Sequence, residues 1–265
     1  MKIGVTGCAG RMGRAVVQQL VSSPGCVLVA ACDRPGTAGI GQDAGSLAGL
    51  EPLGVRVGDD PGAVFAAAQV VIDFTSPEAT ARHAGLAVEN RCALVIGTTG
   101  LSRAVEAALA AAAQHIPIVL APNMSLSLNL LTGLVERVAR ALDESFDIEI
   151  VEMHHRNKVD APSGTALALG RAAAAGRGVK FEDAAVRARD GISGPRRAGD
   201  IGFATLRGGD VVGDHTVIFA GDGERLELTH KVGNRAIFAK GAVRAARWIE
   251  GKPAGLYGMV DVLGL

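Results

Sequence analysis

The sequence lacks the features by which several classes of protein are first identified. Its 27 Lys and Arg residues are balanced by 27 Asp and Glu residues, so no strong net field is available to gather nucleic acid or a membrane surface. No apolar run approaches the ~20 residues that a membrane-spanning helix needs. The opening residues, MKIGVTG, lead directly into a strand-like pattern and not into a signal peptide. We therefore expect a cytoplasmic protein that binds neither nucleic acid nor membranes.

Support for disulfide or metal chemistry is also lacking. The four cysteines, at positions 8, 26, 32 and 92, form no CxxC pair, so we expect small buried side chains in a reducing compartment. Neighbouring residues on a strand point to opposite faces, so His154 and His155 would not share one ion while the strand continues. The sequence contains no HxH or HxxxH spacing. We predict that the protein holds no metal.

The first ~120 residues alternate short apolar runs with alanine-rich stretches, as is typical of a parallel sheet with crossover helices. The expected strands are 2–6, 26–32, 70–74, 93–96 and 116–120. The expected helices are 11–22, a helix to about residue 89 capped by Ser76, and another capped by Ser102. In residues 36–58 the apolar residues recur with no clear helical or strand periodicity.

The pattern changes after Asn123, where a helix over about 127–142 is followed by FDIEIVEMHH. Polar and apolar residues alternate in that segment, which predicts a half-exposed strand with Asp147, Glu149 and Glu152 on its polar face. Beyond a helix that begins at Ser163, strand-like segments are separated by Gly-Asp turns. They are IGFATLR, HTVIFA and RLELTHK.

These patterns predict an α/β protein of two domains. The first, residues 1–124, would be a Rossmann-like dinucleotide-binding domain completed by the C-terminal segment 234–265. The second, residues 125–233, would be an α+β domain with a mixed or antiparallel sheet.

A glycine-rich loop lies between the first strand and the first helix. Gly7, Gly10 and Gly13 follow the spacing GxxGxxG, which suits a tight turn and close approach of a pyrophosphate to the helix N-terminus. Asp33 closes the second strand 20 residues beyond Gly13, where a ribose-binding acid is expected. Arg34 follows it directly, and a guanidinium can hold a 2′-phosphate. A ligand-free glycine turn and a solvated arginine are the simpler alternatives.

Two further loops follow strands at the edge of the sheet where ligands bind in open α/β folds. Gly97-Thr98-Thr99 follows the fourth strand, and Ala121-Pro122-Asn123-Met124 follows the fifth. Each is a candidate for cofactor contact, although ordinary turn chemistry would also explain it.

The densest polar cluster is HHRNKVDAPSGT, residues 154–165. We expect Ser163 to cap the helix that follows, leaving the backbone N–H groups of Gly164 and Thr165 free for an anion. Cationic side chains beside a helix N-terminus predict a pocket for one or two carboxylates, and a solvated loop is the alternative. The other histidines, at 83, 115, 215 and 230, have no local constellation and are expected to be structural.

Three motifs carry a more specific resemblance. GCAGRMG, GTTG and EMHHRNKVDAPSGTAL together resemble the 4-hydroxy-tetrahydrodipicolinate reductase family, also called dihydrodipicolinate reductase. The C-terminal stretch from Gly199 to Ile249 is similar to the same family. The resemblance implies an NADH- or NADPH-dependent reduction of a small cyclic dicarboxylate to tetrahydrodipicolinate, in the diaminopimelate route of lysine biosynthesis. It also implies that the second domain, residues 125–233, binds the substrate and builds a homotetramer.

The resemblance also implies site residues. Proton chemistry is expected at His154 and Lys158, and substrate binding at His155, Gly164 and Thr165. Cofactor binding is expected at Gly7, Cys8, Ala9, Gly10, Arg11, Met12, Asp33, Arg34, Gly97, Thr98, Thr99, Ala121, Pro122, Asn123 and Met124. The chain departs from the family pattern where Asp33 replaces a more usual glutamate, where Met124 replaces a common aromatic, and where Asn157 stands in place of a third histidine.

Two other functions compete with this one. A semialdehyde dehydrogenase would need a cysteine nucleophile, and none of the four cysteines lies beside the histidine cluster in the sequence. A nucleotide-sensing module with a degenerate site would bind NADH without turnover. Consumption of NADPH with enzymatically generated substrate separates these alternatives.

Overall fold

The structure is a computed structural model that describes residues 1–265. The chain divides into two compact units. Residues 1–126 and 236–264 form the first unit, and residues 127–235 form the second together with the terminal Leu265. No helix combines the length and the apolar character that crossing a membrane requires.

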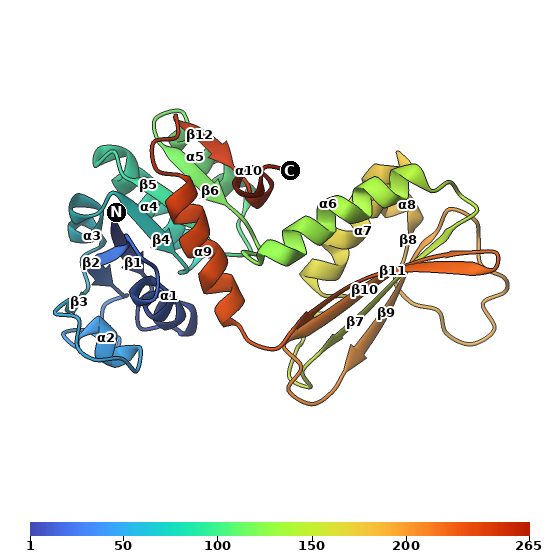
Figure 1. The fold of residues 1–265 in the computed structure, drawn as a ribbon, viewed down its shortest axis with the longest axis horizontal. Coiled ribbons are helices and arrows are strands. Elements are labelled where there is room, and N and C mark those ends of the chain that lie inside the picture. Colours follow the sequence, from blue (N-terminus) through green and yellow to red (C-terminus); the bar gives the residue numbers. More distant parts are fainter. The chain divides into compact units, whose positions relative to one another are not determined.

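The first unit is built on a seven-stranded sheet in the order β12-β6-β5-β4-β1-β2-β3, and every neighbouring pair is parallel (Figure 1). The strands are β1 (Lys2–Thr6), β2 (Val27–Cys32), β3 (Val57–Gly58), β4 (Val70–Asp73), β5 (Ala93–Ile96), β6 (Pro117–Leu120) and β12 (Gly255–Tyr257). The strand order reverses between β1 and β4, which is where open parallel sheets bind ligands.

Helices cover both faces of this sheet. One apolar core joins the strands to α1 and α9, and a second joins them to α3, α4 and α5 (Figure 1). The helices are α1 (Arg11–Val21), α2 (Ala44–Leu47), α3 (Pro61–Ala67), α4 (Pro77–Glu89), α5 (Arg103–Ala112), α9 (Ala236–Trp248) and α10 (Met259–Leu263). The predicted caps of α4 and α5 are confirmed, because Ser76 accepts from Ala79 N and Ser102 accepts from Val105 N.

The second unit has a five-stranded mixed sheet in the order β11-β10-β7-β9-β8. Its central strand β7 runs antiparallel to β10 and parallel to β9. The strands are β7 (Asp147–His154), β8 (Ala185–Val186), β9 (Ile201–Arg207), β10 (Gly213–Gly221) and β11 (Glu224–Val232). The helices are α6 (Leu126–Ala141), α7 (Gly164–Arg177) and α8 (Phe181–Ala184), and their apolar side chains pack with the sheet in one core. The predicted α/β fold with a second, mixed sheet is confirmed.

One prediction about β7 is wrong. Glu152 was expected on the polar face, but it is only 1% exposed and shares the inner face with Ile148, Ile150 and His154. The register of β7 with β9 and β10 is unbroken, so side chains alternate strictly along the strand. A residue at an even position therefore points inward whatever its charge. Met153 correspondingly lies on the other face.

A close backbone contact in the first unit gives a test of this packing. A Cβ atom added at Gly241 of α9 would lie 1.7 Å from the carbonyl oxygen of Met124. We expect Gly241→Ala to lower the free energy of unfolding by ~1–3 kcal/mol, because the backbone must move. Gly85→Ala on α4 is the matched control, since its Cβ meets nothing within 4 Å and the change should stabilise by ~0.5–1 kcal/mol. Urea unfolding that gives both variants the same shift would contradict this contact.

Candidate active site

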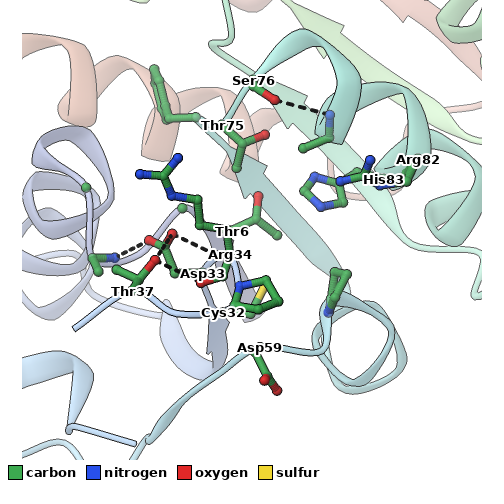
Figure 2. Close-up of a pocket in the computed structure, with 17 residues that line it drawn as sticks. Thr6, Cys32, Asp33, Arg34, Thr37, Asp59, Thr75, Ser76, Arg82 and His83 are labelled. Atoms are coloured by element: carbon green, nitrogen blue, oxygen red, sulfur yellow. Dashed lines mark hydrogen bonds between the residues drawn. The ribbon is translucent and has the colours of Figure 1, made fainter. Parts of the chain in front are cut away.

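A cavity of about 630 Å³ opens at the carboxyl ends of β1, β2 and β4 (Figure 2). It brings together five of the predicted cofactor residues, namely Gly7, Ala9, Gly10, Asp33 and Arg34. Figure 2 shows Asp33 and Thr37 on one side of this cavity and His83 on another. Thr6 also lines it, and its fully buried hydroxyl has no hydrogen-bond partner within the protein.

The glycine-rich loop has the shape that a pyrophosphate requires. Gly7 has φ +69°, a conformation that favours glycine. A Cβ atom at Gly13 would lie 2.1 Å from the carbonyl oxygen of Gly7, so only glycine lets α1 start this close to the loop. Gly10 is the N-cap of α1 and supplies no capping side chain. The first turn of α1 therefore presents backbone N–H groups that suit an anion.

The carboxylate of Asp33 is hydrogen-bonded to the backbone of the glycine-rich loop. Its Oδ2 accepts a hydrogen bond from the backbone N of Ala9 at 2.8 Å, and its Oδ1 accepts one from the backbone N of Arg34 at 2.8 Å. Thr37 Oγ1 lies 3.4 Å from Oδ1. Because a carboxylate has about four lone-pair sites, Asp33 keeps capacity to accept from a ribose hydroxyl.

The remaining predicted cofactor residues do not line this cavity. Cys8 is buried in the core beneath the loop, and burial raises the pKa of its thiol to about 12. Arg11 is exposed in the first turn of α1 and Met12 is half-buried. Among the two strand-end loops, Gly97–Thr99 and Ala121–Met124, the side chains of Thr98, Ala121 and Met124 are buried, while Thr99 and Pro122 are exposed.

A buried network missed by sequence reasoning forms another wall of the cavity. Asp73, at the end of β4, is 0% exposed and accepts from Thr75 Oγ1 at 2.6 Å and Thr80 Oγ1 at 3.0 Å. His83 Nδ1 lies 3.0 Å from Asp73 Oδ2, and His83 lines the cavity. His83 is therefore part of a hydrogen-bonded polar cluster, contrary to the prediction that it has no polar partners nearby. In the sequence, only Asp73 at the carboxyl end of a buried strand indicated such a cluster.

In the second unit the predicted cluster is organised by Glu152. Its Oε2 lies 2.6 Å from His154 Nδ1, and its Oε1 accepts from the backbone N of Ser163 at 3.0 Å. Arg207 donates to both oxygens, at 2.8 and 3.0 Å. Burial alone would raise the pKa of Glu152, but these hydrogen bonds outweigh it and the pKa lies below its usual range. Glu152 is therefore ionised at neutral pH.

His215 is the second histidine whose role sequence reasoning missed. It lies on β10 with 4% exposure, and its ring meets that of His154 edge to face, with centroids 5.1 Å apart. Its Nε2 is 3.0 Å from Ser163 Oγ. Burial, and then the charge of His154, lower the pKa of His215 to about 4. His230 lies further along the sheet with Nε2 2.9 Å from Ser127 Oγ, and His115 is exposed.

The loop after β7 carries the other predicted residues. Lys158 Nζ donates to both carboxylate oxygens of Asp160, at 2.7 and 2.9 Å, and this contact lowers the pKa of Asp160. The predicted cap at Ser163 is confirmed, because its Oγ accepts from Ala166 N at 3.1 Å. Gly164 and Thr165 are the first two residues of α7, and nothing lies within 4 Å of a Cβ added at Gly164. His155 is half-buried, and its backbone N donates to Val211 O.

A parallel sheet with a glycine-rich loop at its switch point, joined in one chain to a histidine–lysine cluster on a second sheet, defines a dinucleotide-dependent oxidoreductase. Comparison with known families identifies which one. The model of the dihydrodipicolinate reductase N-terminus matches residues 1–124, and that of the C-terminus matches residues 127–263. The chain belongs to the dihydrodipicolinate reductase family.

Known proteins of this family are similar to this chain over nearly its full length. The 4-hydroxy-tetrahydrodipicolinate reductase of Rhodopseudomonas palustris is 54% identical, covering 100% of this chain and 98% of that protein. The reductase of the same name from Ruegeria pomeroyi is 57% identical, covering 99% and 98%. A solved dipicolinate-bound dihydrodipicolinate reductase from Paenisporosarcina sp. TG-14 has the same fold, with a TM-score of 0.78, 23% identity and 98% coverage of each chain.

The depressed pKa of His215 predicts an acid-sensitive stability. Between pH 6.5 and about 4 the unfolded chain binds a proton here that the folded chain does not, so the free energy of unfolding falls as pH falls through this window. The loss between pH 7 and pH 5 should be about 2 kcal/mol. We expect His215→Gln to reduce this loss and His115→Gln, at an exposed site, to leave it unchanged. Urea unfolding at both pH values measures it; equal losses in all three proteins would contradict the assignment.

Proposed function

We propose that the chain catalyses the NAD(P)H-dependent reduction of 4-hydroxy-tetrahydrodipicolinate to tetrahydrodipicolinate in the diaminopimelate route of lysine biosynthesis. The proposal is carried by one observation. A chain that matches this family from end to end has both a glycine-loop cavity and a His154–Lys158 cluster. Loss of NADPH absorbance with enzymatically generated substrate tests it, and cofactor binding without turnover would contradict it.

When bound, the reduced nicotinamide would supply a hydride to one end of the conjugated C=C–C=N system that the substrate has once its 4-hydroxyl group has left as water. Electrons then move toward the ring nitrogen and the α carbon, so one proton must be delivered to complete the product. His154 is proposed as that donor, because an imidazole titrates near neutrality. Its proton passes to the substrate, and the ring is left neutral until solvent restores the proton.

Lys158 is proposed to stabilise the charge that develops on the substrate. Its ammonium pairs with the Asp160 carboxylate. A cation near the ring lowers the cost of negative charge in the transition state. His155, Gly164 and Thr165 are proposed to hold the two substrate carboxylates, because the first turn of α7 presents backbone N–H groups and Gly164 lets an anion approach closely.

The first unit is proposed to hold the cofactor. The loop from Gly7 to Met12 would bind the pyrophosphate, Asp33 the ribose, and Arg34 a 2′-phosphate. Having both an acid and a guanidinium at the same cavity supports use of NADH and NADPH alike. The two strand-end loops, 97–99 and 121–124, are proposed as further cofactor contacts because they follow β5 and β6 at the ligand-binding edge.

The resemblance to the family supports a homotetramer assembled through the second unit. The four free cysteines, three of them buried, support a reducing compartment such as the cytoplasm.

His154→Ala tests the proton donor. We expect turnover to fall by roughly 10²- to 10⁴-fold, because general acid catalysis typically contributes that much. NADH affinity, measured by fluorescence titration, should be unchanged. His115→Ala, which removes an exposed histidine of the first unit, should leave both quantities unchanged. Turnover close to that of the unmodified protein in His154→Ala would remove this residue from the mechanism.

Asp33 and Arg34 are tested together through cofactor preference. Asp33→Ala should raise the ratio of kcat/KM for NADPH over NADH, because the acid accepts from a free 2′-hydroxyl and repels a 2′-phosphate. Arg34→Ala should lower the same ratio, since a guanidinium pairs with phosphate. Asp33→Ala should also weaken both cofactors, because the bond to Ala9 N is lost. Unchanged ratios in both variants would exclude these residues from the ribose site.

A further inference from the structure

The geometry points to Glu152 as a positioning residue, which holds His154 with its proton on Nδ1 so that Nε2 is the atom that gives the proton to the substrate. This inference rests on the proposed role of His154 and adds a residue to it. Glu152 and His154 are two residues apart on β7, so their side chains lie on the same face of the strand. An unbroken register on both sides of β7 keeps them there.

The partners of Glu152 require its charged form. Each of its two oxygens accepts two hydrogen bonds. Oε2 accepts from His154 Nδ1 and from one terminal nitrogen of Arg207. Oε1 accepts from the backbone N of Ser163 and from the other terminal nitrogen of Arg207. A neutral carboxylic acid would have to place its own proton against one of these donors. The residue is 1% exposed, and a buried carboxylate persists only when it is paired in this way.

The charge on Glu152 fixes the tautomer of His154. An ionised carboxylate accepts only, so the ring nitrogen 2.6 Å away must carry a proton. The proton that His154 exchanges with the substrate is then the one on Nε2. Arg207 keeps the Glu152 carboxylate from accepting that proton itself, because its guanidinium binds both oxygens.

The opposite side of the ring is shaped to leave Nε2 accessible. A Cβ atom at Gly213 of β10 would lie 2.9 Å from His154 Nε2, so a larger residue there would press on this atom. His215 meets the ring edge to face, but its own Nε2 is engaged with Ser163 Oγ. No hydrogen bond within the protein is formed by His154 Nε2.

The other charged or titratable groups around Glu152 and His154 come from three elements. Arg207 of β9 shares the Glu152 carboxylate with His154, and His215 of β10 meets the His154 ring edge to face. Lys158 lies in the loop that follows β7. Burial, and then the charge of His154, lower the pKa of His215 to about 4, so His215 is neutral at neutral pH. Glu152 is the only carboxylate hydrogen-bonded to His154. Removing its charge should therefore make the protonated ring harder to maintain.

Glu152→Gln is the test, because it replaces the carboxylate with an amide of nearly the same shape. We expect kcat to fall by about 10²-fold, with KM for substrate and NADH affinity within a few-fold of their original values, because orientation and tautomer of the donor are lost while binding groups remain. The basic limb of the pH–kcat profile should move to lower pH. Glu149→Gln is the matched control on the same strand, since Glu149 lies on the other face with Arg189 and Arg196.

A double-mutant comparison distinguishes positioning from general structural support. If Glu152 acts through His154, Glu152→Gln should cause no further loss of kcat in a protein that already carries His154→Ala. An equal 10²-fold loss in that background would overturn the inference, as would normal kcat in Glu152→Gln alone. Normal kcat in His154→Ala would instead overturn the proposed donor, and no turnover of the unmodified protein would overturn the proposed reaction.

A spectroscopic measurement keeps the inference testable if Glu152→Gln fails to fold. Nitrogen-15 histidine spectra of the unmodified protein should include a neutral ring with its proton on Nδ1 that is absent from the spectra of His154→Ala. A second signal of this kind is expected from His83, whose Nδ1 faces Asp73, and it should remain in His154→Ala. Glu152→Asp retains the charge on a side chain that is one methylene shorter. This variant should therefore keep part of the activity. A His154 signal with the proton on Nε2 alone would overturn the inference.

Discussion

A carboxylate withdrawn from water needs donors on most of its lone pairs, and each unit of this protein is arranged around one such group. In the first unit Asp73 is held by Thr75, Thr80 and His83. In the second, Glu152 is held by four donors from β7, β9 and the N-cap of α7. Because these donors belong to different elements, satisfying the carboxylate also fixes where the elements meet.

Such arrangements are explained better by specificity than by stability. A buried ion pair often contributes no more to stability than well-packed apolar side chains would, whereas removing one partner leaves a buried charge uncompensated and is strongly destabilising. The strands around Glu152 carry Ile148, Ile150 and Phe219 in the same core, so an apolar residue at position 152 would suit the packing. A charge there is understandable if His154 needs a fixed orientation and a fixed tautomer. The cost of burial is offset by Arg207 and by the backbone N of Ser163.

The spacing of apolar residues, together with the Gly, Pro and Ser residues at the ends of elements, predicted most of the fold. The expected helix ending at residue 89 is α4, and the segment IGFATLR is β9 with the same bounds. All three predicted serine caps, Ser76, Ser102 and Ser163, form as expected. These features depend on local sequence alone. The local sequence could not predict which residues of β7 face the core. The polar residues at 147, 149 and 152 fit either a β-bulge between 149 and 152 or a buried charge at 152. Only the pairing with β9 and β10 decides for the buried charge. His83 and His215 were missed for the same reason, since their partners lie on other elements.

The role of Asp33 shows that loop shape and cofactor choice are coupled in the first unit. The same carboxylate that faces the cavity accepts from Ala9 N, within the glycine-rich loop. A substitution that alters recognition of the ribose therefore also loosens the turn on which the pyrophosphate would rest. Arg34 is free of this double role, because its guanidinium is exposed and only its backbone N binds Asp33. Cofactor preference is therefore more easily altered, without damage to the loop, at Arg34 than at Asp33.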